Sequence, residues 1–115
     1  MLDLNAIRNG DQTQLGNTTL RNKHLRGVPL RRAGLRRADL RGTDLTGADL
    51  READLRGADL REATLSYADL SDAEILLADF READLSHADL RGTALRRTAL
   101  TGANLCGAIL PDGFN

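Results

Sequence analysis

Asp84, Ser86 and His87 bring the residue types of a hydrolase triad into one short segment of the chain. In such a triad the histidine accepts the serine proton and the carboxylate orients the histidine. The reaction also requires a substrate pocket and donors for a developing oxyanion. We expect these side chains to lie on a flat outer face that offers neither, so we predict no catalytic residues and no enzymatic activity.

Aspartates recur at a spacing that could stack their carboxylates, as at Asp39, Asp59 and Asp79. Ca²⁺ prefers several carboxylate oxygens. Arginines recur beside these aspartates, which favours ion pairing, and the glycine-aspartate nonapeptide of calcium-binding β-rolls is absent. We therefore predict no metal and no cofactor. We expect Cys106 to point outward, and as the only cysteine it cannot form an intramolecular disulfide.

The residues that must position these groups follow a period of five. Leucine stands at every fifth residue from Leu15 to Leu110, replaced only by Ile75 and Phe80. A helix requires apolar spacing near 3.6 residues and a strand requires spacing near 2. A sustained period of five instead indicates a solenoid of small stacked units. Aromatic residues make up only 3% of the chain, which suits a narrow core of leucine and alanine.

The repeated unit reads Ala-Asp-Leu-Arg-Gly, with frequent substitutions outside the leucine. The small residue and the leucine are expected to point inward, while the aspartate before the leucine and the arginine after it point outward. Glycine is expected to form the turn, because a corner at every fifth residue favours a positive φ.

More than a dozen such units in one register resemble the pentapeptide-repeat family, over about residues 28 to 110 with a degenerate extension back to Leu15. The short chain is similar to cyanobacterial members of that family. The resemblance implies an all-β fold, a right-handed quadrilateral β-helix with four repeats per coil. About five coils stacked at about 4.8 Å would give a rod about 24 Å long.

Three segments are predicted: an N-terminal cap at 1–14, the repeat domain at 15–110, regular from about residue 28, and a tail at 111–115. Asp3 can cap a short helix that ends at Asn9 and Gly10. Lys23 takes a position meant for a small inward residue, and Pro29 takes an aspartate position. The tail is too short and too rich in proline and glycine for a helical cap.

Sorting charges by position in the twenty-residue coil separates one basic face from three weakly acidic ones. The basic face surrounds Leu35, Leu55, Ile75 and Leu95, with a net charge of +3; the other faces sum to −1, −1 and −2. On it, Leu76 and Leu77 take outward positions that arginine or glycine fills in neighbouring coils. They are either incidental exposed residues or the centre of a protein contact. The candidate contact residues are Leu76, Leu77, Arg36, Arg56 and Arg96, and the face also carries Arg37 and Arg97.

The C-terminal end of the solenoid is expected to expose core residues and unpaired backbone groups. Ile109, Leu110 and Phe114 are the apolar residues available there. We predict a weak, two-fold symmetric homodimer joined end to end through them. The alternative is a monomer in which Phe114 folds back as a lid.

These features favour a non-enzymatic structural or protein-interaction module with an unknown protein partner. The family resemblance supplies one alternative, since some members imitate duplex DNA, bind DNA gyrase and confer quinolone resistance. A net charge of −1 and the absence of a strongly acidic face argue against it. Nucleic-acid binding through the basic face is a second alternative, weakened by the lack of stacking aromatics. The N-terminal residues have no signal-peptide character, so we expect a cytoplasmic protein without a membrane partner.

Overall fold

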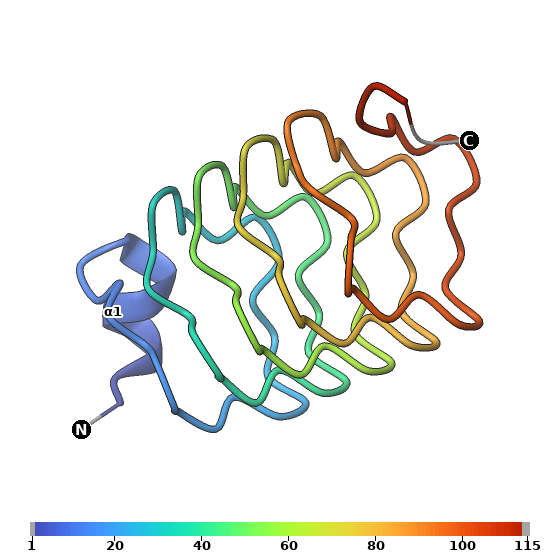
Figure 1. Cartoon of the computed structure of the whole chain (residues 1–115). Coiled ribbons are helices and arrows are strands. Elements are labelled where there is room, and N and C mark those ends of the chain that lie inside the picture. Colours follow the sequence, from blue (N-terminus) through green and yellow to red (C-terminus); the bar gives the residue numbers. More distant parts are fainter. Residues whose placement is uncertain (1, 114–115) are drawn as a thin grey trace.

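The computed structural model describes residues 2–113, which form a rod of 40 × 21 × 21 Å. One helix, α1 (Leu4–Asn9), lies at one end, and the remaining chain winds into stacked coils (Figure 1). The sides of the coils carry isolated parallel β-bridges rather than extended strands. The repeat domain is therefore a β-solenoid, and the rod exceeds the expected length of five coils because it includes α1 and the C-terminal turn.

The coil repeats every twenty residues, as the family resemblance implies. Parallel bridges join residues twenty apart, such as Asp39 with Asp59 and Asp59 with Asp79. The Leu40 amide donates to the Asp59 carbonyl at 2.7 Å, and the Leu60 amide donates to the Asp79 carbonyl at 2.8 Å. Equivalent leucines therefore lie one above another.

Each corner is a turn closed by a hydrogen bond from the small residue to the preceding leucine, as from Ala58 to Leu55 at 3.0 Å. The second residue after the leucine has a positive φ at every corner from Asn17 to Gly107. The expectation that glycine forms these turns is wrong in most of them, because non-glycine residues adopt this conformation at 12 positions. The hydrogen-bonded coil imposes the backbone conformation on polar and apolar residues alike.

The core consists of the two inward residues of each repeat, the leucine and the small residue. Leucines from Leu15 to Leu90 and alanines from Ala33 to Ala88 are buried, and Phe80 fits into a leucine column with 1% exposure. Half-buried leucines continue these columns from Leu95 to the end. The last coil has no following coil within the described residues, so its core is only partly covered.

The predicted N-terminal helix is present and caps the first coil. The Asp3 carboxylate accepts hydrogen bonds from the amides of Asn5 and Ala6, and Gly10 ends the helix in the left-handed conformation at φ 82°. Ile7 is fully buried against the solenoid core. The ladder of β-bridges begins at Gln14, ahead of residue 28, where the regular repeat is expected to start. The inward position of the small residue is buried only from Val28 onward, and Lys23, which takes that position one repeat earlier, is exposed.

Candidate functional site

Most of the outer surface neutralises its own charge. The aspartate before a leucine accepts hydrogen bonds from the residue after that leucine, both from its amide and from its side chain. The Asp54 carboxylate, for example, accepts from the Arg56 amide at 3.2 Å, from Arg56 Nε at 2.8 Å and from Arg56 Nη2 at 2.7 Å. The same arrangement recurs in five more repeats, at Asp39 with Arg41, Asp49 with Arg51, Asp59 with Arg61, Asp79 with Arg81 and Asp89 with Arg91. These pairs explain why an acid and a base stand on either side of the inward residue in these six repeats.

The arginine hydrogen bonds are the largest cause that lowers the pKa of Asp54, Asp59 and Asp79. Arginines also reach the next coil, since Arg41 Nε lies 3.5 Å from Asp59 and Arg61 Nε lies 3.7 Å from Asp79. The stacked carboxylates thus pair with guanidinium groups, as the sequence predicts.

Asp84, Ser86 and His87 do not form a triad. The Ser86 hydroxyl donates to the Asp84 carboxylate at 2.6 Å, and this hydrogen bond is the largest cause that lowers the pKa of Asp84. His87 instead stacks on Tyr67 with ring centroids 4.8 Å apart and an interplanar angle of 12°. The serine proton therefore points to the carboxylate, and the His87 ring is held against Tyr67.

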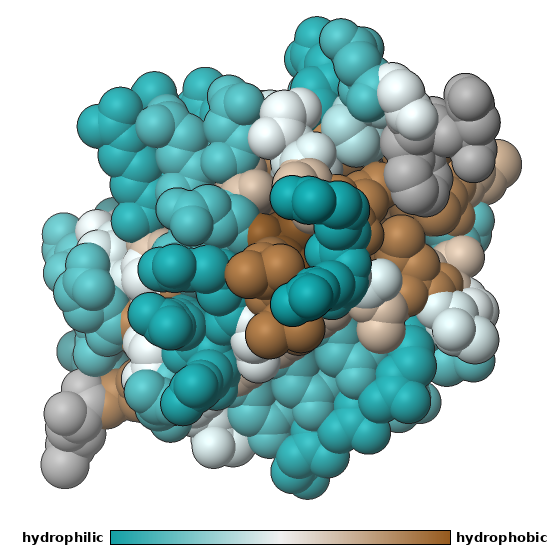
Figure 2. All heavy atoms as spheres, in the orientation of Figure 1, coloured by the Kyte–Doolittle hydropathy of each residue, from teal (hydrophilic) through white to brown (hydrophobic). Residues whose placement is uncertain are grey.

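The basic face differs from the other faces around Leu76 and Leu77. These side chains are 46% and 61% exposed. Leu77 has a φ of 62°, as the corner residues of the other faces also have positive φ, so its apolar exposed side chain is what sets it apart. Figure 2 shows hydrophobic surface near the middle of the rod, bordered by hydrophilic side chains.

The arginines of the basic face are mostly unpaired. Arg56 contacts Asp54 and lies 3.5 Å from Glu74. The other four, Arg36, Arg37, Arg96 and Arg97, have no ion pair among residues 2–113. The structure thus leaves Leu76 and Leu77 exposed and leaves Arg36 and Arg96 without an ion pair among residues 2–113, although the charge of Arg36 still contributes to the lowered pKa of Asp54.

A break in the ladder at this site is a feature that sequence reasoning missed. The bridge expected between Glu74 and Ala94 is absent, although bridges form between Asp54 and Glu74 and between Asp79 and Ala99. A hollow of about 360 Å³ opens there, lined in part by Ile75, Leu76, Ala94 and the arginines Arg56 and Arg96. The available sequence signal is the loss of the repeat consensus, since glutamate and alanine replace aspartate at positions 74 and 94.

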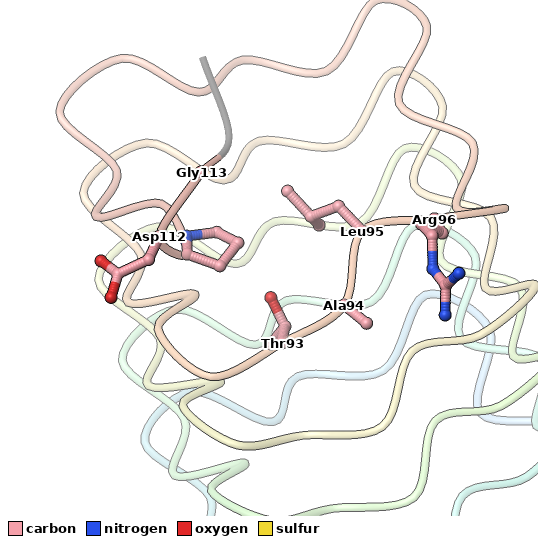
Figure 3. A pocket seen from close by; sticks show the side chains of 7 residues that line it. Thr93, Ala94, Leu95, Arg96, Asp112 and Gly113 are labelled. Carbon is pink, nitrogen blue, oxygen red and sulfur yellow. The ribbon is translucent and has the colours of Figure 1, made fainter.

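The C-terminal end is only partly covered. Ile109 is 48% exposed, Leu110 is half-buried, and Phe114 lies outside the described residues. Thr93 to Arg96 form one side of a hollow of about 440 Å³, and Pro111 to Gly113 form the other (Figure 3). The residues named for an end-to-end contact are therefore accessible where they are described.

Comparison with known proteins places this architecture in a family. The family model for pentapeptide repeats matches eight copies within residues 11–47, 43–75 and 77–111. The chain belongs to the pentapeptide repeat family. Among residues 2–113 of this pentapeptide repeat protein, no helix is long and apolar enough to cross a membrane.

The chain is similar to several solved pentapeptide repeat structures. A protein from Nostoc Pcc 7120 is 39% identical, with 81% of this chain and 78% of that chain covered and a TM-score of 0.52. A protein from the cyanobacterium Cyanothece 51142 is 25% identical, with coverage of 83% and 88% and a TM-score of 0.51. QnrB1, a plasmid-mediated fluoroquinolone resistance protein, is 20% identical, with coverage of 83% and 59% and a TM-score of 0.50, and shares the fold alone. No curated protein matches the sequence.

Proposed function

We propose that this chain is a right-handed quadrilateral β-helix that acts as a non-enzymatic module for binding another protein. The observation that supports this most directly is the exposed apolar pair Leu76 and Leu77 on the basic face. An apolar centre with a charged rim is the usual composition of a protein interface. A rigid repeat rod also offers a preformed surface, so binding would require little ordering of the module itself.

The DNA-mimic alternative is not supported by the surface. Imitation of duplex DNA requires a continuous anionic surface along the rod. The aspartates that could supply it are paired with arginines of the same repeat, as at Asp59 and Asp79. The arginines that remain unpaired in the repeat domain lie on one face, which gives that face the opposite sign.

Affinity capture from a lysate of the native cells tests the proposal. The baits are the wild-type protein, a Leu76→Arg/Leu77→Arg variant and a Tyr67→Arg control. Tyr67 is 66% exposed and takes the same turn position as Leu77 on another face, so the control changes a comparable site. We expect a protein that both wild type and control retain and the double variant loses. Retention of the same proteins by all three baits would contradict the proposed surface.

A further inference from the structure

The unpaired arginines indicate the charge of the partner. Ten arginines lie within 4.0 Å of a carboxylate oxygen, and Arg8 donates to the His24 carbonyl. The remaining four arginines all lie on the basic face: Arg36, Arg37, Arg96 and Arg97. A guanidinium without a partner offers a planar set of donors that matches a carboxylate. This face is therefore complementary to an acidic surface.

The hollow between two coils indicates that the partner also presents an apolar group, which would lie between the unpaired arginines. The Leu77 amide donates to the Arg97 carbonyl at 3.1 Å, twenty residues further on. In the preceding coil the equivalent Gly57 amide donates to the Leu76 carbonyl, only nineteen residues further on, so the register shifts by one residue at Leu77. The amides of Ile75 and Ala94 lack the ladder hydrogen bonds of their counterparts within residues 2–113. The coils thus separate beside the exposed leucines, and the hollow is lined by Ile75 and Leu76.

The turn itself does not require the second leucine. Glycine fills the same corner position in seven turns, including Gly57 in the preceding coil. Leu77 contributes little to the core because 61% of its surface is exposed. Leu77 is one of 12 non-glycine corner residues with a positive φ, so its exposure, and not its backbone conformation, is what a contact with another molecule accounts for.

We infer that the basic face binds an extended acidic segment of a partner protein, which inserts one apolar side chain beside Leu76 and Leu77. This inference rests on the proposed function and specifies the partner's chemistry. The apolar centre and Glu74 suit a peptide better than a phosphate backbone, and the described residues of this face include no aromatic side chain for stacking on bases. Carboxylates on either side of the inserted residue would meet the unpaired arginines.

The coil spacing sets the length of the recognised segment. Leu77 lies two coils from Arg37 and one coil from Arg97, so the separations along the rod are about 10 Å and about 5 Å at about 4.8 Å per coil. An extended peptide advances about 3.3 Å per residue. We expect an acidic residue about three positions from the apolar residue on one side and a second acidic residue one or two positions away on the other.

Selection from a displayed library of random twelve-residue peptides tests the inference. The enriched peptides are synthesised with a fluorophore, and their binding is measured by anisotropy at several salt concentrations. We expect enriched sequences to combine acidic and apolar residues and to bind more weakly as salt rises. Enrichment of neutral or basic peptides, or failure to enrich any peptide, would overturn the inference.

Matched variants separate this face from general electrostatic attraction. Arg36→Glu/Arg97→Glu should weaken binding of the selected peptide at least tenfold, while Arg21→Glu/Arg26→Glu makes the same charge change on other faces and should have an effect below threefold. Leu77→Gly should weaken binding about fivefold with an unchanged circular dichroism spectrum. Equal weakening by both arginine pairs would overturn the inference.

Two outcomes distinguish failure of the partner chemistry from failure of the proposed function. Neutral peptides that bind wild type but not Leu76→Arg/Leu77→Arg would keep the interaction surface and refute the acidic partner. Peptides that bind wild type and that double variant equally would refute the surface itself. Tighter binding of a 30-base-pair DNA duplex than of any selected peptide would favour nucleic acid and refute both.

Discussion

Shortening a central leucine should destabilise the rod far more than shortening the same column at its open end. Leu60 is fully buried, and backbone hydrogen bonds hold its coil to both neighbours, including Leu60 to Asp79 at 2.8 Å. Leu60→Ala removes three carbon atoms, equivalent to about 2.4 kcal/mol of transfer free energy. The coils cannot collapse into the cavity without losing hydrogen bonds, so the total cost should be about 4 kcal/mol.

The matched control is Leu100→Ala, two coils further along the same column. Leu100 is half-buried and has no following coil within the described residues, so its loss should cost about 2 kcal/mol or less. The free energy of unfolding is measured by urea titration followed by far-UV circular dichroism. Equal costs at Leu60 and Leu100, or a cost below about 1 kcal/mol at Leu60, would refute the stacked-column argument. A normally folded Leu60→Asp variant would refute it as well.

Three further predictions concern the charged surface and the ends. Hydrogen bonds from Arg61 and Arg81 lower the pKa of Asp59 and Asp79 in the folded state. The contribution of these pairs to the free energy of unfolding is therefore complete above the ordinary carboxyl pKa of 3.8 and is lost as pH falls through the lower folded pKa values. The melting temperature of the wild type should therefore decrease as the pH is lowered below about 4, and it should decrease less steeply in Asp59→Asn/Asp79→Asn. Equal slopes of melting temperature against pH in the two proteins would contradict this. Lys23→Ala should leave the melting temperature unchanged because Lys23 is exposed, and a loss of several degrees would show that it is part of the core. We also propose a weak end-to-end dimer. Light scattering should then show a wild-type mass that falls on dilution, and an Ile109→Asp variant should have the mass of a monomer at every concentration. A constant monomer mass for the wild type would exclude the dimer.

The sequence predicts the fold well because each repeat provides the same two inward residues. Leu60 and Ala58 are buried as their positions require, and the coil of twenty residues agrees with the four repeats per coil that the family resemblance implies. The capped helix is also predictable, since Asp3 and Gly10 are local signals that need no tertiary information. The corner conformation is not, because propensity alone would not place residues such as Leu77 at a positive φ. The hydrogen-bonded ladder overrides that local preference.

The candidate site is only partly predictable. The exposure of Leu76 follows from its outward position, and the excess of arginine follows from counting charges on each face. The unpaired state of Arg36 and Arg97 requires side-chain positions, because other arginines find acids in the same repeat or the next coil. The hollow beside Ala94 depends on a missing bridge between coils, and such a break depends on how two distant segments fit together.

Amide hydrogen exchange with and without a selected peptide tests the central claim most directly. In the free protein, the amide of Ile75 should exchange at least tenfold faster than that of Leu55, which donates to the Glu74 carbonyl at 2.8 Å in an intact part of the ladder. The bound peptide should slow exchange at residues 74–77 and 94–97 and leave the Tyr67 face unchanged. Slow exchange at Ile75 in the free protein, or protection centred on another face, would contradict the account.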